Sequence, residues 1–114
     1  DDYVTLRLNE RVCPYDLSIL PLFDKDGMDE LANSLLSEIL SIRGVQVNLD
    51  STGSIGKRYA RADEIGVPWA VTVDHSSLVD GTVTIRNRDN QQQIRVGTEK
   101  LISHIESGDI SSLF

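Results

Sequence analysis

Cysteine, histidine and aromatic residues are scarce in this sequence of 114 residues. Cys13 is the single cysteine, which excludes an internal disulfide framework and is typical of a reducing compartment. No histidine is near it in the sequence, so we expect an inert, partly buried thiol and not a nucleophile. The two histidines, His75 and His104, have no cysteine or carboxylate cluster at metal-ligand spacing. The sequence therefore predicts neither a metal site nor a catalytic triad.

Long apolar runs are absent as well. No stretch approaches the roughly 18 apolar residues that a membrane-spanning helix needs. There is no signal peptide or Arg-rich transit segment, and the abrupt start on Asp1 and Asp2 indicates a fragment of a longer protein. With 39% hydrophobic and 25% charged residues, we expect one globular domain, too small to include a catalytic domain as well.

Positive charge is in short supply. The chain has 11 Lys and Arg against 18 Asp and Glu, a net charge of −7, which argues against a general nucleic-acid binder because phosphate attraction needs clustered cations. Residues 52–97 nevertheless hold more cations than acids, and the rest of the chain is strongly acidic. We therefore expect a small, local RNA contact. The cations of this segment are Lys57, Arg58, Arg61, Arg86, Arg88 and Arg95.

The sequence is organised around residues 52–74. A glycine-punctuated turn is followed by a predicted helix at Ile55–Ile65 and by a strand after Pro68. At 100° per residue this helix has an apolar side and a charged side. The apolar side holds Ile55, Tyr59, Ala62 and Ile65, the charged side holds Lys57, Arg61 and Glu64, and Arg58 lies on the border. Spacing alone favours an ordinary surface helix with solvated charges.

Residues 54–67 read Ser-Ile-Gly-Lys-Arg-Tyr-Ala-Arg-Ala-Asp-Glu-Ile-Gly-Val. This run resembles the signature of the C-terminal anticodon-binding domain of glycyl-tRNA synthetase, in its archaeal and eukaryotic form. The threonyl, prolyl and histidyl relatives share a looser skeleton, which appears here as Gly56, Gly66-Val67-Pro68 and the Gly-Thr-Val-Thr-Ile-Arg of residues 81–86. The resemblance extends over roughly residues 11–105 and includes the Val-Cys-Pro of 12–14 and the Leu-Pro-Leu of 20–22.

The element order predicted from periodicity is β-α-β-α-β-β-β-α. Strands are expected at 17–22, 45–49, from Trp69 to Val73, at 82–88 and around Ile94 and Val96. Helices are expected at about 27–42 with Asp26 as N-cap, at 55–65, and after Thr98 as cap until Gly108. Residues 74–81 are predicted to be a loop.

The resemblance implies an α/β fold, a five-stranded mixed β-sheet flanked by three α-helices. Residues 17–108 would form the anticodon-binding domain, with 1–16 as a leading segment or linker and 109–114 as a C-terminal tail. This tail is shorter than the family pattern after Gly108-Asp109-Ile110, which puts tail contacts in question.

The candidate site is a base-reading surface. Glycine anticodons carry cytosines at the second and third positions, and a cytosine edge offers one amino donor and the N3 and O2 acceptors. Unpaired anticodon bases can be stacked and read on these edges. The resemblance places acceptors at Asp63 and Glu64, donors at Arg58 and Arg61, a stacking platform at Trp69, and base or phosphate contacts at Arg86 and Arg88.

Each of these assignments has a plainer alternative. Trp69 shares its parity with Val71 and Val73 and is equally well explained as core. Asp63 could pair within its helix, whereas Tyr59 is expected to pack. Arg95 is expected to be a solvated strand residue.

The resemblance also implies a parent enzyme, an ATP- and Mg-dependent glycine–tRNA ligase that acts as a homodimer in the cytoplasm or in a mitochondrial form. This domain would have no catalytic residues or cofactor of its own. Its partners would be the anticodon loop of tRNA(Gly) and the N-terminal catalytic domain, with no role for membrane or DNA. Anticodon binding would position the acceptor end and so contribute to kcat/KM.

Other functions remain open. The same fold serves the accessory subunit of a mitochondrial DNA polymerase, and the charge of −7 would suit an interaction module without RNA. Gly53-Ser-Ile-Gly56 matches the GXXG of KH domains, but that loop joins two helices and this one follows a strand. The same run is too short for a phosphate-binding P-loop.

Overall fold

The computed structural model describes residues 15–22 and 27–114. The thiol of Cys13, the match at residues 12–14 and the expected cap Asp26 lie outside the described residues.

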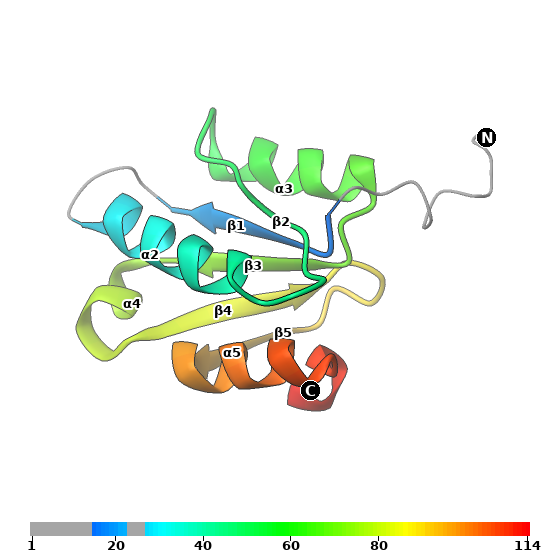
Figure 1. Ribbon diagram of the computed structural model, residues 1–114. Helices are drawn as coiled ribbons and strands as arrows, with labels where there is room; N and C mark the ends of the chain where they lie inside the picture. Colours follow the sequence, from blue (N-terminus) through cyan, green and yellow to red (C-terminus); the bar gives the residue numbers. More distant parts are fainter. Residues whose placement is uncertain (1–14, 23–26) are drawn as a thin grey trace.

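Five strands form one mixed sheet in the order β2-β1-β3-β4-β5 (Figure 1). Strand β1 (Leu17–Pro21) pairs in parallel with β2 (Val47–Leu49) on one side and with the central strand β3 (Trp69–Val73) on the other. The strands β4 (Thr82–Asn87) and β5 (Gln93–Gly97) extend the sheet in antiparallel pairing. The five-stranded mixed sheet expected from the sequence is confirmed.

The described residues form four α-helices, one more than expected. They are α2 (Met28–Leu40), α3 (Ile55–Ile65), α4 (His75–Asp80) and α5 (Thr98–Ser107), and a 3-10 helix η1 (Ile110–Leu113) follows them.

The additional helix α4 replaces the loop predicted at residues 74–81. Its start is fixed by a capping box in which Ser77 N donates to Asp74 Oδ1 at 3.2 Å and Asp74 N donates to Ser77 Oγ at 3.0 Å. Gly81 ends it in the left-handed conformation, with φ of 72°. Polar residues dominate this helix, so it has no apolar period that the sequence pattern could reveal.

Two other helix starts differ from expectation by one residue. The N-cap of α2 is Gly27, whose φ of 86° suits glycine, and no side chain caps this helix. The N-cap of α5 is Gly97, and Thr98 is the first helical residue. Helix α2 also ends at Leu40, two residues before the expected end at 42.

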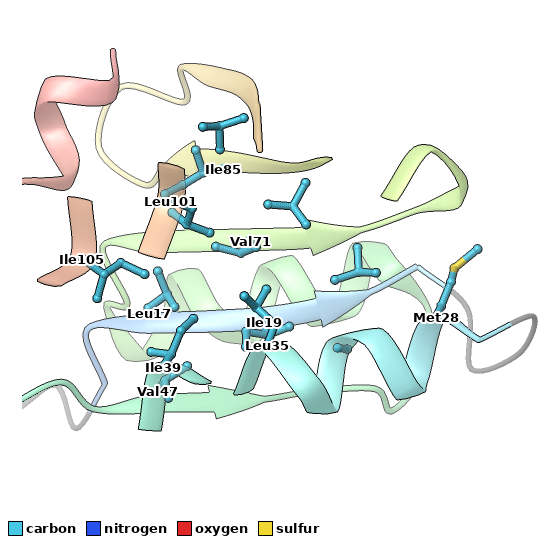
Figure 2. Packing of buried hydrophobic residues seen from close by; sticks show 14 residues of the cluster. Leu17, Ile19, Met28, Leu35, Ile39, Val47, Val71, Ile85, Leu101 and Ile105 are labelled. Atoms are coloured by element: carbon cyan, nitrogen blue, oxygen red, sulfur yellow. The ribbon is translucent and has the colours of Figure 1, made fainter. Parts of the chain in front are cut away.

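The main core lies between one face of the sheet and the helices α2 and α5 (Figure 2). Strand residues of one parity supply the sheet side, among them Leu17, Ile19, Val71 and Ile85, all with no exposed area. The apolar stripe expected on α2 is confirmed. Its buried members are Met28, Ala32, Leu35 and Ile39.

Helix α3 packs on the opposite face of the sheet. The Tyr59 hydroxyl bonds to Thr72 Oγ1, a β3 residue of the parity that points away from the core. Ala62 is buried, yet it is not part of the main cluster. The sheet is therefore covered on both faces, but α3 is the single helix that covers this second face within the described residues. Residues of α3 contact β1 and β3, because Arg58 bonds to Pro21 O and Tyr59 bonds to Thr72 Oγ1.

The residues after α5 pack back onto the domain. The Phe114 ring stacks on Trp69 with centroids 5.5 Å apart and an interplanar angle of 26°. His104 Nδ1 lies 2.9 Å from Ser112 Oγ, which joins α5 to the tail.

Candidate nucleic-acid interface

The seven candidate residues do not form one patch. Arg58 is buried between α3 and the sheet. Arg61 and Glu64 lie on the β2 side of α3, and Asp63, Arg86 and Arg88 lie on its β4 side. Trp69 lies on the other face of the sheet.

Arg58 is buried, with 7% of its area exposed, and does not lie on the helix border as expected. Its guanidinium donates to carbonyls on two segments. It bonds to Pro21 O and, at 3.5 Å, to Leu22 O at the end of β1. It also bonds to Thr52 O at 3.2 Å and Gly53 O at 2.7 Å in the turn before α3. Arg58 therefore ties this turn to the sheet, and its donors point away from solvent.

Arg61 forms a bidentate ion pair with Asp50, which follows β2. Arg61 Nε lies 2.7 Å from Asp50 Oδ2 and Nη2 lies 2.9 Å from Oδ1, while Nη2 also donates to Thr52 O at 2.6 Å. These hydrogen bonds lower the pKa of Asp50 to about 2 and raise the pKa of Arg61. The Arg61 side chain remains 44% exposed, so the ion pair lies at the protein surface.

Asp63 faces β4, where it meets two arginines. Arg86 Nη2 lies 3.4 Å from Asp63 Oδ2 and donates to Gln91 Oε1 at 3.0 Å. The Arg86 guanidinium also stands over the Tyr59 ring, 4.6 Å from its centroid. Arg88 Nε donates to the Asp63 carbonyl at 3.2 Å. The strand period predicted that Arg86 and Arg88 lie on the same side, and both do contact Asp63, although β4 ends at Asn87.

Glu64 is exposed on the other side of α3. Within residues 15–22 and 27–114, no hydrogen bond or ion pair involves its carboxylate. It borders a cavity of about 260 Å³ between α3 and the β1–β2 edge. The neighbours Asp63 and Glu64 therefore serve different surfaces. The lining residues include Ser18, Leu20, Asn48, Asp50, Arg61, Ala62 and Ile65.

Sequence reasoning missed Ser18 and Asn48. Both lie at strand positions that alternate with apolar residues, so they read as solvent-facing strand residues. Their signal was available in principle, because a polar pair on adjacent parallel strands must lie side by side when the strands pair in register, as Ser18 and Asn48 do.

Trp69 lies apart from α3. It is paired in register with Asn87, whereas the next β3 residue, Ala70, is paired with Arg86. Because successive side chains point to opposite faces, Trp69 and Arg86 lie on opposite faces of the sheet. The half-buried indole packs against the core and Phe114, and borders a second hollow of about 360 Å³ beside α5 and η1.

Arg95 is an exposed residue of β5, as the sequence predicts, but it is also paired. Its Nη2 lies 2.5 Å from Asp74 Oδ2, and its Nη1 donates to Thr82 Oγ1 at 3.0 Å. The pairing lowers the pKa of Asp74 below its usual range. It also ties β5 to the start of α4.

The part of the chain that the structure describes contains no cluster of three His, Cys, Asp or Glu residues that could hold a metal ion. None of its helices is long and apolar enough to cross a membrane. What the site offers is hydrogen-bond donors and acceptors around one helix.

Comparison with known proteins gives the family. The family model described as Anticodon binding domain matches residues 16–107. The glycine–tRNA ligase of Methanothermobacter thermautotrophicus is 49% identical over 88% of this chain and 18% of its own length. The glycine–tRNA ligase of Treponema denticola is 43% identical over 94% of this chain and 24% of its own length. The chain thus spans about a fifth of the curated relatives that it matches.

Solved structures show the same fold. A prolyl-tRNA synthetase from Cryptosporidium parvum matches with a TM-score of 0.74 and 21% identity, over 82% of this chain and 20% of that chain. The RNA binding domain of a threonyl-tRNA synthetase from Cryptosporidium parvum Iowa II matches with a TM-score of 0.74 and 22% identity, over 85% of this chain and 24% of that one. The chain belongs to the anticodon-binding domain family, in the form that glycine–tRNA ligases carry.

Proposed function

We propose that this chain reads the anticodon of tRNA(Gly) as one domain of a glycine–tRNA ligase. The observation that carries the proposal is the 49% identity to such a ligase over most of the chain, including the helix that exposes Lys57, Arg61 and Glu64 at the surface. The remainder of the parent would hold the catalytic domain, bind ATP and Mg, and act as a homodimer in the cytoplasm or in a mitochondrial form.

The chemistry of α3 supports reading of cytosine edges. A carboxylate can accept from the exocyclic amino group, and an Arg or amide N–H can donate to the ring acceptors. Glu64 offers such a carboxylate without a competing partner among the described residues, and Arg86 and Arg88 offer cations next to Asp63. Arg58 is assigned to positioning, because its donors are held by backbone carbonyls.

The proposal is tested by titrating the chain with a tRNA(Gly) anticodon stem-loop. The control is the same stem-loop with both anticodon cytosines replaced by uracil, and both are measured at several salt concentrations. We expect tighter binding of the cytosine form, by about tenfold or more, at every salt concentration. Equal, weak and salt-driven binding of both RNAs would contradict base reading and would favour an interaction module without RNA specificity.

A further inference from the structure

We propose that the cavity bordered by Glu64 takes one cytosine base of the single-stranded RNA, and that Asn48 is a second base-reading residue there. The inference rests on the proposed function and specifies where one anticodon base goes.

The size and lining of the cavity suit a single aromatic ring. Its floor is apolar, formed by Leu20 and Ala62, which are 0% and 5% exposed. Ile65 stands at its rim with 45% of its area exposed, so its side chain is available to contact a base. The volume of about 260 Å³ is below the range of about 300–1,000 Å³ that larger organic ligands occupy.

The polar groups of the cavity fit a cytosine edge. Ser18, which is 1% exposed, donates from Oγ to Asn48 Oδ1 at 2.5 Å and so fixes the orientation of the amide. Asn48 Nδ2 then keeps its hydrogens free of any acceptor in the described part of the chain. One free donor at Asn48 and one free acceptor at Glu64 match cytosine, which has ring acceptors beside an amino donor. Uracil reverses this pattern, because its N3 is a donor and its O4 an acceptor.

The charges around the cavity favour a base over a phosphate. The cations Arg58 and Arg61 are matched by the acids Asp50 and Glu64, and both guanidiniums already hold protein oxygens. A phosphate needs surplus positive charge, whereas a neutral base needs hydrogen-bond groups and an apolar surface. The cavity therefore has no surplus positive charge for a phosphate, but it offers hydrogen-bond groups for the edge of a base.

Two isosteric variants test the inference. Asn48→Asp keeps the acceptor for Ser18 but removes the free donor. Glu64→Gln removes the free charge and introduces a donor. The matched control is Glu38→Gln, an exposed glutamate on α2. Each full chain is titrated with the cytosine stem-loop and with two stem-loops that carry uracil at one anticodon position each.

We expect the unaltered chain to prefer cytosine at both positions. At one of them Asn48→Asp and Glu64→Gln should each reduce this preference by about 10- to 100-fold, and Glu38→Gln should leave it unchanged. A full preference at both positions in both variants would overturn the cavity as the base site while leaving anticodon reading intact. No preference in the unaltered chain would instead contradict the proposed function. Glu64 is exposed, so its variant keeps the test valid if Asn48→Asp unfolds, which circular dichroism would show.

Discussion

Arg58 shows how a permanent charge can be accommodated under a helix. Removing a guanidinium from water is costly unless its N–H groups find acceptors. Four hydrogen bonds to backbone carbonyls meet this need. The same hydrogen bonds satisfy carbonyl groups at the end of β1 and in the turn before α3. One side chain thereby fixes the helix that presents the candidate reading residues.

The Asp50–Arg61 pair gives a pH-dependent contribution to stability. The pKa of Asp50 is about 2 in the folded protein, against an ordinary value of 3.8, so the unfolded chain binds more protons between these values. The contribution is present above pH 4 and is lost as the pH falls through 2. Because the Arg61 side chain is 44% exposed, solvent screens the pair, and we expect this contribution to the free energy of unfolding to be small.

Urea unfolding of the unaltered chain and of Asp50→Asn, measured between pH 2 and pH 6, checks this expectation. The variant should be less stable at pH 6, and the two free energies of unfolding should converge towards pH 2. A constant difference across the range would show that the pair has no titrating role.

A variant of Trp69 can distinguish a packing role of this residue from a role in RNA binding. Its face of the sheet is the one opposite Arg86, and Phe114 stacks on its ring. We therefore expect Trp69→Ala to lower the free energy of unfolding by about 1–3 kcal/mol and to leave the cytosine preference unchanged. Thermal unfolding and the stem-loop titration measure the two effects separately. A lost preference in a stable variant would instead place the indole on a base.

Helix α3 shows what a sequence pattern can and cannot predict. Its bounds, Ile55–Ile65, were predicted correctly, and the structure shows what fixes them: the Ser54 side chain accepts from Lys57 N, and Gly66 ends the helix in the left-handed conformation. The faces were predicted less well, since Arg58 is buried and Ile65 is 45% exposed. Periodicity treats a cation as exposed and an isoleucine as buried, and it takes no account of backbone carbonyls that need donors.

The same limit explains the candidate site. Residues 58–64 were found from the family signature, but the pattern does not say which side of the helix each one serves. The partners that separate Asp63 from Glu64 come from strands distant in the sequence, β4 on one side and the β1–β2 edge on the other. Asn48 was missed for that reason.

Helix α2 is held by its apolar stripe, and it offers a matched pair of leucines. Leu35 is 2% exposed in the core, whereas Leu40 is 56% exposed at the end of the same helix. We expect Leu35→Ala to lower the free energy of unfolding by about 2–5 kcal/mol through lost burial and the cavity left behind. Leu40→Ala should change it by less than about 1 kcal/mol. Urea unfolding of both variants measures the difference, and similar losses would contradict the assignment of the buried face.

Charge is distributed unevenly over the whole molecule. Glu38, Glu99 and Glu106 line a hollow between α2 and α5, on the side of the sheet opposite α3. With a net charge of −7, the chain as a whole repels RNA. If the anticodon binds against α3, the RNA phosphates lie on the side of the domain away from this acidic groove, the hollow lined by Glu38, Glu99 and Glu106.

Neutralising the acidic groove tests this orientation. The shortest dimension of the domain is 25 Å, which exceeds the Debye length of about 10 Å at 0.1 M salt but not the length of about 30 Å at 0.01 M. The triple variant Glu38→Gln, Glu99→Gln, Glu106→Gln should therefore bind stem-loop RNA a few-fold more tightly at low salt and about equally at 0.15 M. The gain should be the same for the cytosine and uracil forms, because a distant charge acts on phosphates and not on base edges. A gain that persists at high salt, or that favours one base, would mean that the RNA lies against α2 and α5 instead.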